Sequence, residues 1–174
     1  MNIKINKGKN MISRTQIEEF EKEKGISLPE SYKAFLTEFN GGKPETNIFN
    51  IDKNNDAGVN EFIELKKIDE VIYIYKNRIP NSVLPIAHSE GGNLVCLGID
   101  KKNFDDVFFW DHEGEKLDEN KEPSITNLYL ISKSFGEFLK KLKPFDMSSV
   151  VLKPGQVKKV WIDPDFKKRL DLES

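Results

Sequence analysis

The sequence has few of the residues that build catalytic and metal sites. It contains one cysteine, Cys96, and two histidines, His88 and His112. One cysteine excludes an intrachain disulfide, and these residues cannot supply the four nitrogen and sulfur ligands that structural zinc usually takes. The G-x-S-x-G and H-E-x-x-H motifs and the P-loop and Rossmann glycine patterns are also missing. We therefore expect no catalytic residue, no metal and no bound cofactor.

The sequence also lacks an excess of charge of one sign and lacks long apolar runs. Its 27 Lys and Arg residues stand against 29 Asp and Glu residues, whereas nucleic-acid binders usually carry a clear basic excess. No apolar run reaches the ~18–20 residues of a membrane-spanning helix, and the N-terminus has no stretch typical of a signal peptide. We expect a cytoplasmic protein without a nucleic-acid or membrane partner. The oligomeric state stays open.

What is present is the composition of one folded domain. The chain has 174 residues, of which 37% are hydrophobic and 32% charged, and this suits a single solvated domain with a real core. We expect a polar N-terminal arm over residues 1–12 and a domain over 13–145. Residues 146–174 form a C-terminal extension, whose apolar residues are expected to dock, with an added strand as one form of docking.

Two helices are predicted near the N-terminus. Ser13 and Gln16 have the spacing of a capping box, and Gly25 suits a left-handed helix end. A second helix begins at Pro29, a favoured first helical position, and ends at Gly41-Gly42. Its apolar positions follow the i, i+3, i+4, i+7 spacing of a helix: Tyr32, Phe35, Leu36 and Phe39. The short link between the two helices predicts a packed helical hairpin.

Two further helices are predicted later in the chain. "IDEVIYIYKN" has residues that favour a strand, but the spacing of its apolar positions favours a helix. "SKSFGEFLKKLK" has a clear helical period, with Ser132 or Ser134 as the cap and Pro144 as the stop. Its apolar positions are Phe135, Phe138, Leu139 and Leu142.

Five short apolar runs predict strands. "TNIFNI" and "VNEFIEL" are expected to be two strands joined by the polar loop 52–56. "VLPIA" contains Pro85, which favours an edge or a strand end, whereas "NLVCLGI" and "DVFFWD" are apolar on both faces. The short connectors "HSEGG" and "DKKNFD" favour antiparallel hairpins. Strands linked by hairpins, with the helices separate from them, predict an α+β fold.

The stretch "HSEGGNLVCLGID" leaves two interpretations open for Cys96. With His88, His112 and Asp111 nearby it could belong to a nucleophile or metal site, but its neighbours Val95 and Leu97 favour a buried strand. The glycines at 91 and 92 favour a turn with positive φ rather than a phosphate loop. The turns "HSEGG" and "DHEGE" are expected at the same end of the sheet.

Residues 84–118 hold eight acidic residues against three lysines. These acids form either a solvated rim or a negatively charged face for a basic protein partner. Candidate contact residues for such a partner are His88, Glu90, Asp105, Asp106, Asp111, His112, Glu113 and Glu115. Trp110 is expected in the core, and if exposed it would be an interface anchor.

Four segments, in this order over residues 13 to 143, resemble the SUKH superfamily, which includes the Smi/Knr cell-wall regulators and many bacterial toxin-immunity proteins. They are "ISRTQIEEFEKEKGISLPESYKAFLTEFNGG", "VLPIAHSEGGNLVCLGID", "VFFWDHE" and "SKSFGEFLKKL". The resemblance implies a single curved, mainly antiparallel sheet with helices beside it. It also implies a non-catalytic protein-binding module, most simply an immunity protein that neutralises a cognate toxin, often a nuclease. The alternative is a regulatory scaffold of the Smi/Knr type.

Overall fold

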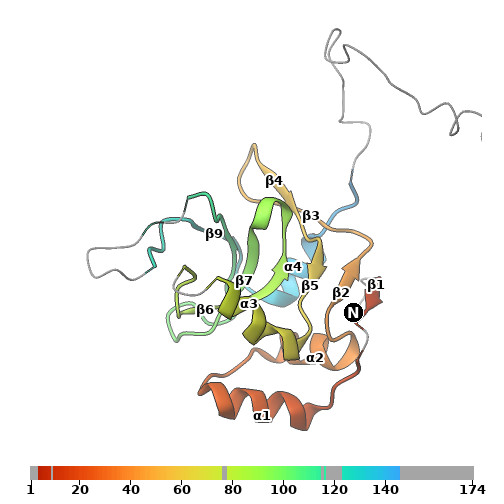
Figure 1. Ribbon diagram of the computed structural model, residues 1–174. Helices are drawn as coiled ribbons and strands as arrows, with labels where there is room; N and C mark the ends of the chain where they lie inside the picture. The colour runs from red at the N-terminus through yellow and green to blue at the C-terminus, as the bar shows by residue number, and fades with distance from the viewer. Residues whose placement is uncertain (1–3, 9, 76–77, 115, 117–122, 146–174) are drawn as a thin grey trace, which may run out of the picture.

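A seven-stranded antiparallel sheet forms the centre of the molecule in the computed structural model (Figure 1), with strand order β1-β2-β5-β6-β7-β8-β9. The structure describes residues 4–8, 10–75, 78–114, 116 and 123–145, so the expected docking of residues 146–174 lies outside it. The strands are β1 (Ile5–Lys7), β2 (Gly42–Pro44), β3 (Ile48–Asn50), β4 (Asp56–Gly58), β5 (Glu61–Phe62), β6 (Val83–His88), β7 (Leu94–Gly98), β8 (Val107–Trp110) and β9 (Leu128–Ser132). The helices are α1 (Arg14–Lys24), α2 (Glu30–Glu38), the 3-10 turn η1 (Leu65–Lys67), α3 (Ile68–Ile74), the 3-10 turn η2 (Glu90–Gly92) and α4 (Phe135–Lys141). The predicted α+β fold is confirmed.

The helix boundaries follow the signals in the sequence. Ser13 and Gln16 form the predicted capping box: the Gln16 backbone N–H donates to the Ser13 hydroxyl, and the Ser13 N–H donates to the Gln16 side chain at 2.9 Å. Gly25 ends α1 with a φ of 64°. Pro29 lies just before the first helical residue of α2, and α2 ends at Glu38, slightly earlier than predicted. Helix α4 begins after Ser134, whose hydroxyl accepts a hydrogen bond from the Glu137 N–H.

An aromatic cluster joins α2 and α4 to one face of the sheet. Phe35 of α2 lies 4.8 Å from Phe62 of β5 and 5.2 Å from Phe135 of α4, measured between ring centroids. Phe135 also meets the Tyr32 ring at 5.0 Å, edge to face, a favoured geometry for aromatic pairs. All four side chains are buried. The helical spacing that predicted α2 and α4 thus delivers the residues that hold them on the sheet.

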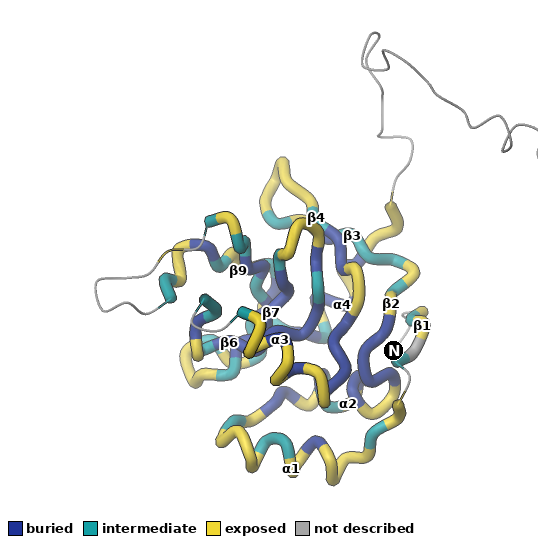
Figure 2. The backbone as a smooth tube through the Cα atoms, in the orientation of Figure 1, coloured by how far each residue is buried: buried dark blue, intermediate teal, exposed yellow. Residues whose placement is uncertain are grey.

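Helix α3 covers the opposite face of the sheet. Trp110 of β8 is on this face, fully buried, and meets the Tyr75 ring edge to face at 5.4 Å. The expectation of a core Trp110 is therefore confirmed, and it is not an exposed anchor. Figure 2 shows the central strands β6 and β7 as buried, in agreement with the apolar residues that β7 carries on both faces.

The pairing of the early strands differs from the prediction. Strand β3 pairs with β4, with Ile48 opposite Gly58, and the two form a separate two-stranded sheet. The expected partner of β3, the run "VNEFIEL", instead contributes the short β5 to the main sheet. The polar loop therefore ends in a strand of its own, Asp56–Gly58, whose three residues carry little apolar signal.

Strand β6 is central and Pro85 lies inside it, so the prediction that Pro85 marks an edge or a strand end is wrong. A register shift between Pro85 and Ala87 accommodates the proline against β7, and β5 is so short that it pairs only with Ala87 and His88. Four strands were not predicted: β1, β2, β4 and β9. The first lies within residues expected to form a polar arm.

Truncating Phe135 to alanine should lower the free energy of unfolding by about 3–5 kcal/mol, because it empties the centre of the aromatic cluster. Phe145→Ala is the matched control: Phe145 is 57% exposed, so this change should alter stability far less. Urea unfolding followed by circular dichroism measures both. Equal losses in the two variants would show that the cluster does not hold the helices on the sheet.

Candidate functional site

A groove of about 740 Å³ opens beside the β3–β4 hairpin, at the end of the sheet where the β6–β7 and β8–β9 turns lie. The apolar part of its lining, which we call the floor, includes Phe109 of β8, Tyr129 of β9 and Phe145. Five carboxylates line it: Asp52, Asp56, Glu90, Asp111 and Glu113. Among the described residues that line the groove, Lys143 is the one cationic side chain. We call this feature the acidic groove.

The β3–β4 hairpin lies beside the β6–β7 turn (Figure 1), and residues of both line the acidic groove. The Gly58 N–H donates to Glu90 Oε2 at 2.9 Å, and the Ser89 hydroxyl donates to the Gly58 carbonyl at 2.7 Å. A Cβ atom at Gly58 would overlap the Glu90 carboxylate, so a larger residue there would displace this side chain from its hydrogen bond. Glu90, predicted from the sequence as a contact residue, also fastens the hairpin to the sheet.

The hairpin supplies two more carboxylates. Asp52 accepts hydrogen bonds from the backbone N–H groups of Asn54 and Asn55, at 2.7 and 3.0 Å, and from the Asn55 side chain at 2.8 Å. These bonds favour the charged form and lower the pKa of Asp52 below its ordinary value. Asp56 accepts a hydrogen bond from the Asn50 side chain. Both carboxylates are thus held in place on the rim.

The turn after β8 supplies the opposite wall. The Glu113 N–H donates to Asp111 Oδ1 at 3.0 Å, and Asn93 Oδ1 accepts both the backbone N–H and the ring Nδ1 of His112, at 3.0 and 3.1 Å. Because Asn93 Oδ1 is an acceptor, His112 carries a proton on Nδ1. The bond from Asn93 to His112 joins the two turns, so their predicted location at one end of the sheet is confirmed.

The other predicted contact residues lie elsewhere. His88 borders a separate hollow beside α3, with Glu61 and Lys67. Asp105 accepts a hydrogen bond from the Phe135 N–H at 3.0 Å, and Asp106 forms an ion pair with Lys133 at 3.1 Å.

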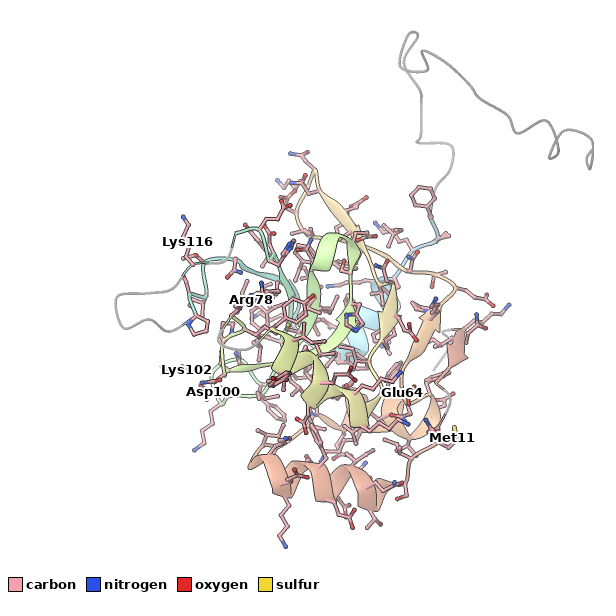
Figure 3. All side chains as sticks on the ribbon, viewed as in Figure 1. Met11, Glu64, Arg78, Asp100, Lys102 and Lys116 are labelled. Atoms are coloured by element: carbon pink, nitrogen blue, oxygen red, sulfur yellow. The ribbon has the colours of Figure 1, made fainter. Side chains whose placement is uncertain are left out.

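The two aspartates lie in the β7–β8 turn with Asp100. This turn is at the opposite end of the sheet from the segment after β8, which lines the acidic groove; Asp100 and Lys116 mark the two places in Figure 3. Glu115 lies outside the described residues. The sequence prediction missed Asp52, Asp56 and Tyr129, because neither the β3–β4 pairing nor β9 was foreseen.

The interpretation of Cys96 as a buried strand residue is confirmed. Its side chain is fully buried in β7, and desolvation raises the pKa of the thiol far above its ordinary value. Gly91 and Gly92 adopt φ values of 66° and 86°, as expected for a turn. Within the described part of the chain, no three His, Cys, Asp or Glu side chains are arranged to hold a metal ion.

His88 should make the fold less stable in mild acid. Its partial burial lowers its pKa below the ordinary 6.5, so the folded state binds the proton less well than the unfolded state does. The folded state is therefore favoured while His88 is neutral. This contribution to the free energy of unfolding is complete above the ordinary pKa of histidine and is lost as the pH falls below it. The variant His88→Gln should therefore lose less unfolding free energy than the wild type between about pH 7.5 and about pH 5.5. An equal or steeper loss in the variant would contradict this assignment.

Comparison with known proteins confirms the family resemblance seen in the sequence. The chain is 31% identical over 146 residues to the SPbeta prophage-derived uncharacterized protein YokK of Bacillus subtilis (strain 168), covering 71% of each chain. No helix in the described residues is long and apolar enough to cross a membrane. Residues 11–141 match the SMI1/KNR4 family, also called SUKH-1. The chain belongs to this family, whose members include immunity proteins.

Proposed function

We propose that this chain is an immunity protein that neutralises a cognate toxin domain by binding it in the acidic groove. The observation that carries the proposal is the composition of the groove: five carboxylates surround an apolar floor, with one lysine among the described lining residues. A basic protein surface, such as the substrate-binding face of a nuclease, is the complement of that lining. Binding there would block the toxin by occupying its surface, without chemistry.

The charges and the floor have different roles in this proposal. Concentrated negative charge attracts a basic partner and speeds its approach. Exposed aromatic surface supplies the apolar burial that makes a complex last. Tyr129 and Phe145 are exposed by 44% and 57% and both line the groove. They are the anchors that we propose, in place of the buried Trp110.

The hydrogen bonds within the rim support a binding role. Asp52, Asp56, Glu90 and Asp111 each accept at least one hydrogen bond from their own surroundings. Side chains already held in position lose less conformational entropy when a partner binds. A rim of this kind is suited to tight recognition of one protein rather than to loose attraction of any cation.

The direct test is to purify the full chain together with the product of the neighbouring gene and to assay that product for toxicity. The proposal predicts a stoichiometric complex and loss of the toxic activity. A neighbouring product that is neither bound nor inhibited, together with recovery of housekeeping proteins only, would contradict it and favour a regulatory scaffold.

Removing two charges from the groove should weaken the complex. The double variant Asp111→Asn and Glu113→Gln keeps the side-chain oxygen that accepts the Glu113 N–H, so the turn should fold. Affinity should fall by roughly tenfold, mainly through slower association, and its dependence on salt should decrease. Surface plasmon resonance at several salt concentrations measures both effects.

The matched control is Glu19→Gln with Asp100→Asn, which makes the same change in net charge. Glu19 lies on α1 and Asp100 in the β7–β8 turn, both exposed and away from the groove lining. Equal weakening in the two double variants would mean that only net charge matters and would contradict binding in the groove.

A further inference from the structure

Strand β9 is the last strand of the sheet, and its outer edge is apolar. Its sequence is Leu-Tyr-Leu-Ile-Ser, without a charged residue, and both Tyr129 and Leu130 are 44% exposed. No strand in the described ranges pairs with its outer side. Proteins usually protect such edges with charge, proline or a bulge. The ladder between β8 and β9 shifts register just after Leu130, but β9 has neither a charge nor a proline. The opposite edge follows that rule, because β1 carries Lys7 within its three residues.

The backbone of β9 is oriented to accept a partner strand. The Asp111 N–H donates to the Asn127 carbonyl at 3.0 Å, and β8 and β9 stay in one register up to Leu130. Bonded and non-bonded pairs alternate in an antiparallel ladder, so Tyr129 faces β8 while Leu128 and Leu130 turn their backbone groups outward. Leu128 already donates its N–H to the Ile125 carbonyl. Leu130 is therefore the position that offers both a donor and an acceptor.

The side chains around Tyr129 and around Ile131, on the same face of the sheet, carry opposite charge. Tyr129 lines the acidic groove together with Asp111 and Glu113. Ile131, two residues on, lines a hollow of about 400 Å³ together with Lys140 and Lys141, the last two residues of α4. An antiparallel copy of the same strand would place each acidic region beside a basic region.

We propose that β9 pairs antiparallel with β9 of a second copy of this chain, about a two-fold axis at Leu130. The Leu130 N–H of each copy then donates a hydrogen bond to the Leu130 C=O of the other copy. On the groove face Tyr129 lies beside the Ile131 of the second copy, so each acidic groove continues into the lysine-lined hollow of its neighbour. Such an isologous contact closes after two copies, and it extends the sheet across both.

The dimer does not rest on the proposed function. It uses the outer side of β9, whereas the toxin would enter the groove on the face of the sheet. Two copies would therefore present two grooves on one continuous sheet. Loss of toxin binding without loss of the dimer, or the reverse, separates the two proposals.

Sedimentation velocity of the full chain tests the contact. At ~100 µM, a concentration at which even a weakly associating dimer is populated, the wild type should be a dimer. Leu130→Lys should be a monomer with unchanged circular dichroism, because it places two like charges opposite each other on the axis. Tyr73→Lys is the matched control: Tyr73 is an exposed apolar residue on α3, 75% exposed, and this variant should stay a dimer.

A cysteine at the axis gives a second, independent result. Residues opposed in a hydrogen-bonded antiparallel pair lie ~5.5 Å apart between Cα atoms, which suits a disulfide. Because the native Cys96 is buried, Leu130→Cys should form a disulfide-linked dimer under mild oxidation, whereas Tyr73→Cys should not. A monomeric wild type, a dimer unaffected by Leu130→Lys, or equal cross-linking of both cysteine variants would overturn the proposal. Slow hydrogen exchange of the Leu130 amide in a monomeric wild type would also overturn it, because this chain would then cover its own edge.

Discussion

The contact between Gly58 and the Ser89–Glu90 turn determines whether the acidic groove exists. It joins the two-stranded β3–β4 sheet to the main sheet through two hydrogen bonds, of 2.9 and 2.7 Å. On the other strand of the hairpin, opposite Gly58, the Ile48 N–H donates to the Lys143 carbonyl at 2.9 Å, which secures β3 to the segment after α4. With the hairpin held at both places, its aspartates face the turn after β8 across an apolar floor.

The same side-chain type has two roles at the two ends of the sheet. Asp105 and Asp106 bind the start of α4 and Lys133, so their charge is used within the fold. The carboxylates of the groove accept hydrogen bonds from nearby donors, most of them neutral backbone or amide groups, which position the charge without cancelling it. Among the described residues that line the groove, the one cation, Lys143, donates to the Asn50 side-chain oxygen at 2.8 Å. Negative charge therefore remains on one face and is available to a partner.

Local signals in the sequence predicted the helices and the central strands well, because capping, helical spacing and runs of buried residues act over a few neighbours. The positions of Ser13, Gly25, Phe135 and Cys96 were all predicted in this way. The early pairing was not, since β3, β4 and β5 have two or three residues each, and short strands take their partners from tertiary contacts. The groove was only half predicted for the same reason. Glu90 lies in the turn of a predicted hairpin, and Asp111 and Glu113 lie in a turn that was predicted at the same end of the sheet. Asp52 and Asp56 reach them through the Gly58 contact.

The most direct measurement of the central claim is nuclear magnetic resonance of the isotope-labelled chain titrated with its toxin domain. The account predicts that the backbone amide shifts that change most belong to the rim and floor of the groove: residues 52–56, 111–113 and Tyr129. Changes centred on α1 or on the β7–β8 turn, with the groove unaffected, would contradict it.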